Sequence, residues 1–328
     1  MAKYLITGDW HVTKGLRTNV ILQYLQYLQD YCFENKIDYL IIDGDVFDKS
    51  SNIKNEAFVP IFLKLLEMKE LGIKMIFIPG NHDIMNVDND SIIETFRSFA
   101  TVYKVGTDVE LLNDKFYFLP YTKSEKDLPE PSHEKYLITH LSIADFSFDN
   151  AYHATEKHAF KRSLFEGWRQ VFTGHFHRAQ IWKNICYVGS PVQMNRGEKG
   201  QTKGFVVLDT DLEKWDFIEY TQAPTFVEIT EDDIMNIKNM SFDNKYVVVR
   251  INQKIKDYAK LRYILYEKGA IDIIPVFESE DEDSGEIQEV DINTDLDKMT
   301  KEIIMEMKQE GIDNQLLIKI FDEVLEKC

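Results

Sequence analysis

The sequence predicts an α/β fold with a largely parallel or mixed sheet, followed by a small α+β unit and a pair of C-terminal helices. Short apolar runs rich in Ile, Val, Leu, Tyr and Phe alternate along the chain with longer segments of helical periodicity. Such alternation is typical of βαβ units. Most of the runs lack strict apolar-polar alternation, as expected for strands that are covered on both faces.

Five apolar runs predict the strands of the α/β part. They are residues 3–7, 38–42, 74–78, 135–139 and 170–173. Helical periodicity predicts helices between them over 19–34 and 55–71, with Pro60 either in the first turn or at a kink because proline cannot donate a backbone hydrogen bond. Ser91 and Glu94 form a capping-box pattern, which predicts that a third helix begins there.

The composition changes near residue 224. Strand-like runs and one helical segment then predict a small α+β unit: strands at 225–230, 245–252 and 271–277, and a helix at 254–269. Residues 278–291 hold eight acidic side chains and no basic one, which is typical of a solvated linker. Two amphipathic helices follow over 294–310 and after Gly311, and their apolar stripes need either the enzyme itself or a partner's coiled coil to cover them.

We therefore expect four parts in the chain. They are an α/β domain over 1–223, a small α+β capping domain over 224–277, an acidic linker over 278–293 and a helix-loop-helix over 294–328.

Charge is distributed unevenly over the 328 residues. The net charge of −18 argues at first against a polyanionic substrate, but residues 226–328 carry −12 of it. The three cysteines form no C-x-x-C, so neither a zinc knuckle nor a disulfide framework is expected. The N-terminus moves directly into a strand-like run, and no apolar stretch is long enough for a membrane span. We expect a cytoplasmic protein with no targeting segment.

Polar side chains follow directly where the five apolar runs of the α/β part end. These residues are Asp9 and His11, Asp45 and Asp48, Asn81 to Asp83, His140, and His175 and His177. In four of the five endings a glycine precedes the first polar group, which allows a tight turn and a close backbone approach. Since ligands collect at the carboxyl ends of parallel strands, we expect these side chains to converge on one rim.

The donor set contains carboxylate, imidazole and amide groups and no thiolate. Such donors suit Mn²⁺, Fe²⁺ or Zn²⁺ and disfavour a sulfur-bound structural zinc. Seven ligands, comprising two aspartates, one asparagine and four histidines, suit two ions that share a bridging carboxylate. Two ions about 3.5–4 Å apart can stabilise an in-line phosphoryl displacement. Taken singly, each ending is weak, because a lone "GNHD" can be a turn and His140 alone can be a satisfied histidine. Five together are hard to ascribe to chance.

The five endings read D-x-H, G-D-x-x-D, G-N-H-D, H and G-H-x-H, in this order over residues 9–177. In this the chain resembles the calcineurin-like metallophosphoesterases. The resemblance implies a four-layer αββα fold with two mixed β-sheets flanked by helices. Within that superfamily the chain is similar to SbcD-type DNA nuclease subunits, especially phage-encoded ones. The similarity is carried by "GDVFD" without a following Arg-Gly, by "GNHD", by residues 187–211, and by the trailing domain and helix pair.

The resemblance implies seven metal ligands, which are Asp9, His11, Asp45, Asn81, His140, His175 and His177. One ion would be held by Asp9, His11 and His177. The second would be held by Asn81, His140 and His175, with Asp45 bridging the two.

The same resemblance implies roles for the remaining polar groups. His82 would act near the scissile phosphate, either stabilising developing charge or protonating the leaving oxygen. Asp48 would orient a ligand, and Asp83 would fix its loop. Six basic residues are candidates for DNA phosphate contacts: Lys49, Lys54, Arg178, Arg196, Lys199 and Lys203.

The function implied is a two-metal phosphodiesterase that hydrolyses DNA as an exonuclease and endonuclease. It would act in DNA end processing, recombination and repair, in a bacterial cell or a phage-infected host, with Mn²⁺ as the preferred ion and Mg²⁺ as the alternative. Its partners would be DNA, an SbcC-type coiled-coil, SMC-like ATPase bound through the C-terminal helices, and a second copy of the chain bound through helices near 55–70 and 90–100.

Two other functions are compatible with the same residues. A phosphomonoesterase or cyclic-nucleotide phosphodiesterase would keep the metals but leave the small domain and the helix pair without a purpose. A binding module that has lost catalysis would typically have eroded ligands, whereas all seven positions and His82 are intact here.

Overall fold

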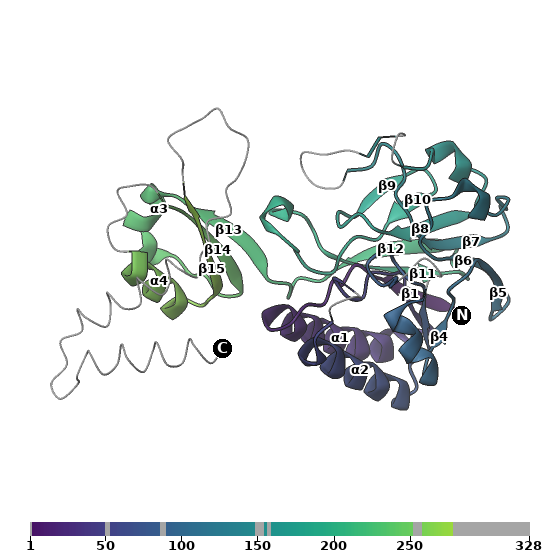
Figure 1. The fold of residues 1–328 in the computed structure, drawn as a ribbon, viewed down its shortest axis with the longest axis horizontal. Coiled ribbons are helices and arrows are strands. Elements are labelled where there is room, and N and C mark those ends of the chain that lie inside the picture. The colour runs from purple at the N-terminus through teal and green to yellow at the C-terminus, as the bar shows by residue number, and fades with distance from the viewer. Residues whose placement is uncertain are drawn as a thin grey trace. The chain divides into compact units, whose positions relative to one another are not determined.

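The structure is a computed structural model that describes residues 2–49, 53–85, 90–147, 154–155, 159–251 and 258–277. The chain divides into two compact units, residues 1–226 and 227–328 (Figure 1). The expected acidic linker and C-terminal helix pair lie outside the described residues.

The first unit contains a six-stranded mixed sheet that includes the N-terminal strand (Figure 1). Its strands, in spatial order, are β12 (Lys214–Glu219), β11 (Gly204–Asp209), β1 (Lys3–Thr7), β2 (Tyr39–Ile42), β3 (Met75–Phe77) and β4 (Thr101–Val102). Strands β1 to β4 are parallel, β11 is antiparallel to β1, and β12 is antiparallel to β11. The parallel core brings the carboxyl ends of β1, β2 and β3 to one edge.

A second six-stranded sheet in the same unit is also mixed. Its spatial order is β5 (Thr107–Leu111), β6 (Asp114–Leu119), β7 (Tyr136–His140), β8 (Gln170–Gly174), β10 (Ile185–Tyr187) and β9 (Gln180–Trp182). Strands β6, β7, β8 and β10 are parallel, and β5 and β9 are antiparallel edges. The carboxyl ends of β7 and β8 therefore also lie together.

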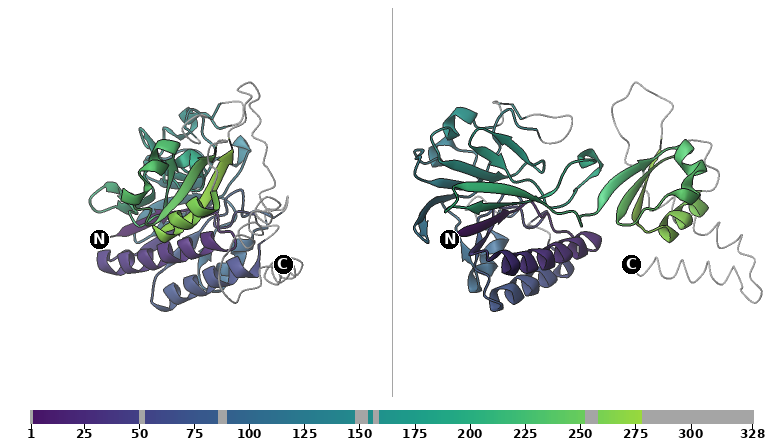
Figure 2. Two further views of the ribbon diagram at one scale, coloured as in Figure 1. Left: turned by 90° about the vertical axis from the view of Figure 1, so that its left-hand side faces the viewer. Right: turned by 180° about the vertical axis from the view of Figure 1, so that it is seen from behind.

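Three hydrophobic clusters define the layers of this unit. One joins the two sheets and includes Tyr4 and Ile41 of the first and Phe118 and Phe172 of the second. Another packs α1 (Leu16–Asn35) and α2 (Asn55–Glu70) on the outer face of the first sheet (Figure 2). The third covers the outer face of the second sheet and includes residues of the 3₁₀ helix η4 (Arg162–Phe165). The predicted class, two mixed sheets flanked by helices, is confirmed.

The helices differ from the sequence prediction in detail. Helix α1 begins three residues earlier than expected, and Pro60 lies inside α2 at its sixth residue rather than in the first turn. The segment after Ser91 forms a 3₁₀ helix, η2 (Ile92–Ser98), and not an α-helix. Its apolar residues Ile93 and Phe96 recur at a spacing of three, which matches the three residues per turn of a 3₁₀ helix.

The second unit has a three-stranded sheet in the order β13-β14-β15. Its elements are β13 (Thr225–Ile229), α3 (Glu231–Met235), the 3₁₀ helix η6 (Ile237–Asn239), β14 (Lys245–Ile251), α4 (Tyr258–Glu267) and β15 (Ala270–Phe277). Strands β14 and β15 are parallel, and α4 connects them and packs its apolar face on the sheet. Among the described residues of both units, no helix has the length and apolar character to cross a bilayer.

Candidate metal centre

The loops that follow β1 and β2 are joined by backbone hydrogen bonds. The amide of Asp9 donates to the carbonyl of Gly44 at 2.9 Å, and the amide of His11 donates to the carbonyl of Asp45 at 3.0 Å. The parallel pairing of the two strands places these loops side by side. The first two polar endings of the sequence therefore form one continuous wall of the site.

Close backbone approach explains the glycines that precede the polar endings. Gly44 has φ +113°, and a Cβ there would lie 2.5 Å from Nδ1 of His140. A Cβ at Gly174 would lie 2.7 Å from the same atom. Positive φ values also occur at four expected ligands, Asp9, His11, Asp45 and His175. Non-glycine residues rarely adopt this conformation, and it concentrates at functional sites.

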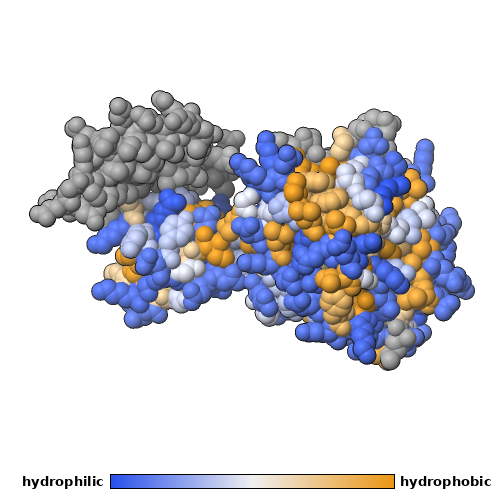
Figure 3. Space-filling model, turned by 90° about the horizontal axis from the view of Figure 1, so that it is seen from below, coloured by the Kyte–Doolittle hydropathy of each residue, from blue (hydrophilic) through white to orange (hydrophobic). Residues whose placement is uncertain are grey.

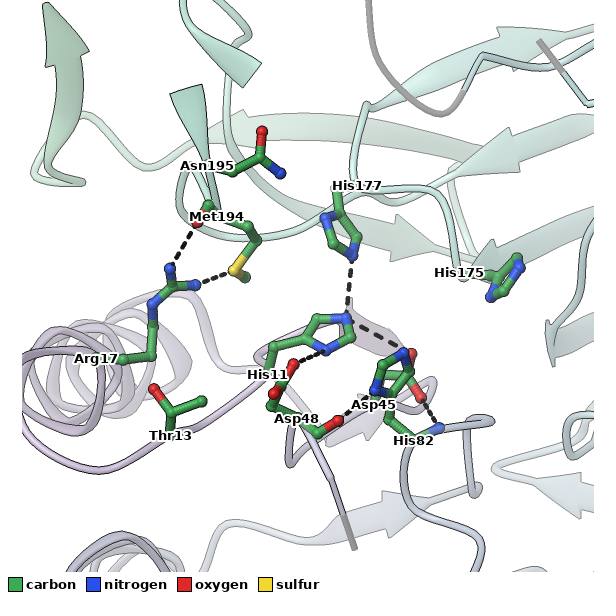
Figure 4. A pocket seen from close by; sticks show the side chains of 10 residues that line it. All are labelled: His11, Thr13, Arg17, Asp45, Asp48, His82, His175, His177, Met194 and Asn195. Carbon is green, nitrogen blue, oxygen red and sulfur yellow. Dashed lines mark hydrogen bonds and ion pairs between the residues drawn. The ribbon is translucent and has the colours of Figure 1, made fainter. Parts of the chain in front are cut away.

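The described residues contain three groups of possible metal ligands, one of which, His11 with Asp48 and His82, shares His11 with the donor cluster formed by Asp9, His11 and His177. In this donor cluster, one ligand atom of each residue lies within 4.8 Å of the others. The Nε2 atoms of His11 and His177 are 3.0 Å apart, and Figure 4 shows the two rings pointing at each other. The structure thus brings together the three residues expected to hold one ion.

The second cluster contains Asp45, His140 and His175, again within 4.8 Å. Oδ1 of Asn81 lies 3.2 Å from Nε2 of His140 and 2.8 Å from Nδ1 of His175. Oδ2 of Asp45 lies 3.2 Å from Nε2 of His140 and 3.5 Å from Nε2 of His11. One carboxylate oxygen therefore lies between the two clusters, where a bridging ligand would be.

The spacing of the donors fits divalent ions. An octahedral ion with bonds of about 2.1 Å holds adjacent donor atoms about 3 Å apart. The separations of 2.8, 3.0 and 3.2 Å between neighbouring donors match that value. Oxygen and imidazole donors without sulfur are the set that Mn²⁺, Mg²⁺ or Zn²⁺ accepts.

The electrostatics of the centre favour positive charge. Burial lowers the pKa of His11, but hydrogen bonding to Asp48 and Asp9 outweighs it and raises the pKa to about 10. His140 behaves alike, since burial is outweighed by the charge of Asp45 and the pKa rises to about 10. His175 has its pKa lowered to about 4 by burial and by its neighbour His140. The carboxylates that hold protons on two imidazoles are equally suited to attract metal cations.

Three of the histidines have their second ring nitrogen engaged away from the centre. Nδ1 of His140 donates to the backbone carbonyl of Asp43 at 2.8 Å, and Nδ1 of His177 donates to Oε1 of Glu198 at 2.8 Å. Nδ1 of His11 faces Oδ1 of Asp48 at 3.6 Å. Such contacts fix the tautomer and direct Nε2 toward a metal.

His82 lines a cavity of about 440 Å³ together with four of the expected donors, His11, Asp45, His175 and His177 (Figure 4). The backbone amide of His82 donates to Oδ1 of Asp45 at 2.8 Å, and its Nδ1 contacts the carbonyl oxygen of Asp48. Its ring therefore lies beside the donor clusters, stacked edge-on against His11. The ligand-rich wall and the open space together form a site for a small anionic group.

Asp83 is fully buried and holds two loops together. Its Oδ1 accepts from the amides of Val46 and Phe47 at 3.0 and 3.3 Å, and its Oδ2 accepts from the amide of Gly80 at 3.0 Å. Burial, assisted by the charge of Asp45, raises the pKa of Asp83 to about 7. The loop-fixing role expected for this residue is confirmed.

Sequence patterns did not reveal three residues of this region. Glu198 contacts His177 from a loop 21 positions later. Arg17 lines the cavity from α1 and donates to the carbonyl of Met194 at 2.9 Å. Asp43 is buried, its carboxyl oxygens accept no hydrogen bond from the described residues, and burial raises its pKa well above the usual range. Glu198 and Arg17 belong to no glycine-marked ending, and Asp43 stands before the glycine of its ending rather than after it.

Lys203 corrects one expectation. We expected it at the DNA surface, but it is only 4% exposed, and its Nζ lies 2.6 Å from Oε2 of Glu198. A buried ammonium with a carboxylate partner has no access to a phosphate backbone. Five of the six basic candidates are exposed: Lys49, Lys54, Arg178, Arg196 and Lys199.

Comparisons with known proteins agree with this site. The calcineurin-like phosphoesterase family matches residues 2–203, well over half of the chain. The chain is 25% identical to exonuclease subunit 1 of Enterobacteria phage T4, over 66% of this chain and 67% of that protein. It is 26% identical to the SbcD component of the SbcCD nuclease of Staphylococcus epidermidis, over 64% of this chain and 66% of that protein. The chain thus spans about two thirds of the length of both relatives.

Among solved structures, an archaeal phosphodiesterase has a TM-score of 0.37 at 13% identity, and the match covers 66% of this chain and 99% of that one. The family match extends over every donor of the two clusters, from Asp9 to His177. The chain belongs to the calcineurin-like phosphoesterase family and is a metal-dependent hydrolase.

Proposed function

We propose that this protein is a two-metal phosphodiesterase that cuts DNA and works as the nuclease subunit of a larger complex. The observation that carries the proposal is the convergence of seven donors, four of which line an open cavity of about 440 Å³. The names of the two relatives, an exonuclease subunit and a component of the SbcCD nuclease, support DNA as the substrate.

Two divalent ions fit the donor clusters. We propose Asp9, His11 and His177 for one ion, Asn81, His140 and His175 for the other, and Asp45 as the bridge. When bound, the ions would supply Lewis acidity and neutralise charge at the phosphate, and Mn²⁺ is the ion we propose, with Mg²⁺ as the alternative.

His82 is the proposed general acid. Its ring lines the cavity and is not among the seven proposed ligands, although it lies in a group with His11 and Asp48, and its Nδ1 contacts the carbonyl oxygen of Asp48. That contact leaves Nε2 as the atom that can deliver a proton to the leaving oxygen. Asp48 has a second role, since its carboxylate faces Nδ1 of His11 and orients that ring.

A lysine-lined cavity offers a path for the DNA backbone. It measures about 190 Å³, is lined by Lys14, Lys49 and Lys54, and shares Thr13 and Asp48 with the larger cavity. Ammonium groups at this place would neutralise phosphates adjoining the scissile one. The acidity of the whole chain does not oppose this, because most of it belongs to residues 226–328.

Three substrates distinguish the candidate functions. Linear end-labelled duplex DNA, an aryl phosphodiester and an aryl phosphomonoester are each incubated with the protein and Mn²⁺ or Mg²⁺, with Asp45→Asn as the control. We expect cleavage of DNA and of the diester, and none by the control. Cleavage of the monoester alone would replace the nuclease by a phosphomonoesterase. Metal binding without any hydrolysis would leave a binding module.

We propose two macromolecular partners besides DNA. One is an SbcC-type coiled-coil ATPase, docked on the amphipathic helices expected over 294–328, which lie outside the described residues. The other is a second copy of the chain. Apolar side chains gather on the side of the first unit where α1 and α2 lie (Figure 3). On α2, Val59 is 45% and Leu63 is 57% exposed, one turn apart.

A further inference from the structure

We propose that Glu198 and Lys203 are positioning residues that set His177 for its metal ion. The proposal rests on the metal centre described above and assigns a role to a buried ion pair that lies outside both donor clusters. The Glu198 carboxylate is held in place by the Lys203 ammonium group. It keeps the imidazole of His177 in the one tautomer and orientation that presents Nε2 to an ion.

Glu198 is bound from every side. It is 2% exposed and ends the short 3₁₀ turn η5 (Arg196–Glu198). Its Oε1 accepts from Nδ1 of His177 at 2.8 Å and from Nδ2 of Asn195 at 3.3 Å. Its Oε2 accepts from the amide of Met194 at 2.9 Å and from Nζ of Lys203 at 2.6 Å. A carboxylate has about four acceptor positions, so its orientation is fixed.

Lys203 anchors this carboxylate to the strand-end loop that carries His177. Its Nζ donates to the carbonyl of His177 at 2.8 Å and to Oγ of Ser190 at 2.9 Å, in addition to Glu198. One ammonium group therefore holds both the backbone and, through Glu198, the ring of the same histidine. Burial by itself would raise the pKa of Glu198, but hydrogen bonding to His177 and the charge of Lys203 outweigh it and lower the pKa to about 2. The carboxyl stays an anion.

The two ions differ in what orients their histidines. His140, assigned to the other ion, is oriented by the backbone carbonyl of Asp43, which no substitution removes. His177 depends on a side chain. A substitution of Glu198 should therefore lower the affinity for the ion at His177 and leave the affinity for the ion at His140 unchanged. A general loss of folding would lower both affinities.

The test is titration of Mn²⁺ into metal-free protein by calorimetry, without DNA, for the wild type and two variants. Glu198→Gln should weaken one of the two ions by about 10- to 100-fold, the usual effect of removing a group that orients a metal ligand. The double variant Glu198→Gln, Lys203→Met leaves no unpaired buried charge, and it should regain folding stability without regaining the lost affinity. Glu166→Gln, at an exposed pair with Lys183, is the matched control.

The outcomes separate positioning from structure. Anomalous diffraction from crystals of the double variant grown with Mn²⁺ should show the ion beside His140 and not the one beside His177. Equal weakening of both ions, unchanged affinity in Glu198→Gln, or recovery of affinity in the double variant would each overturn the proposal. A wild type that binds two ions but cuts no DNA would refute the proposed function and leave this inference standing.

Discussion

The Nε2 atoms of His11 and His177 lie 3.0 Å apart, although 166 positions separate the two residues in the chain. Nδ1 of His177 donates to Glu198, and Nδ1 of His11 faces Asp48. The raised pKa of His11, about 10, means that the neighbouring carboxylates hold a proton on this ring, and a divalent cation can take the place of that proton between the two Nε2 atoms. The contact is therefore the arrangement expected for two ligands of one metal ion.

Replacing His82 should separate chemistry from metal binding. We expect His82→Ala to lower the rate of DNA cleavage by about 10²- to 10⁴-fold, the usual contribution of a general acid. The bound Mn²⁺, measured by elemental analysis, should remain at the wild-type level because the ring is not among the seven proposed ligands. Loss of metal together with activity would show that His82 supports the centre instead.

Removing the lysines beside the second cavity should affect DNA and spare small substrates. For Lys49→Gln, Lys54→Gln we expect weaker DNA binding and a salt slope shallower by about 0.9 for each lost phosphate contact, or about 2 in total. Hydrolysis of an aryl phosphodiester should not change. Lys69→Gln, at the other end of α2, is the control. An unchanged salt slope would remove these lysines from the DNA path.

Asp83→Asn should destabilise the scaffold of the site. A single amide oxygen cannot replace both carboxylate oxygens, which accept from the amides of Gly80, Val46 and Phe47. A buried amide left without an acceptor costs about 1–3 kcal/mol. We expect a loss of that size in the free energy of unfolding, measured with denaturant in the presence of a chelator. Asp30→Asn on exposed α1 surface should be neutral.

The pH dependence of the Asp83→Asn effect follows from the raised pKa of Asp83. Burial lifts this pKa from its ordinary 3.8 to about 7, so the folded protein holds a proton that the unfolded chain releases between these values. The contribution of Asp83 to the free energy of unfolding is fully present below pH 4 and is lost as the pH rises through 7. The gap in unfolding free energy between wild type and variant should therefore narrow from pH 4 to 7. A gap that widens would contradict the assignment.

Dimerisation through α2 is tested by charge. Leu63→Lys places a cation on α2 beside the exposed Val59, and we expect sedimentation to change from dimer to monomer. Leu212→Lys introduces the same charge at a residue that is 60% exposed elsewhere, and it should leave the dimer intact. A wild type that sediments as a monomer in dilute solution would refute the interface.

Partner binding is tested by truncation. A version that ends at residue 290 lacks the expected helix pair, and we expect it to lose an SbcC-type ATPase in a pull-down while it still hydrolyses an aryl phosphodiester. Retention of the ATPase by both versions would place the docking surface elsewhere.

The sequence predicted that these side chains converge because they follow apolar runs that are easy to recognise. It could not show that β3 and β7 belong to different sheets, since both are short, continuously apolar strands. Donors from both sheets nevertheless meet at one centre. The sequence did not reveal Glu198 because its partner, His177, is distant in sequence. The expected DNA contact of Lys203 was wrong because charge alone does not reveal burial.

Diffraction from crystals grown with Mn²⁺, recorded at the manganese absorption edge, tests the central claim most directly. We expect two anomalous peaks about 3.5–4 Å apart, one beside Asp9, His11 and His177 and the other beside Asn81, His140 and His175. The Asp45 carboxylate should contact both. A single peak, or two peaks with Asp45 touching neither, would contradict the two-metal phosphodiesterase.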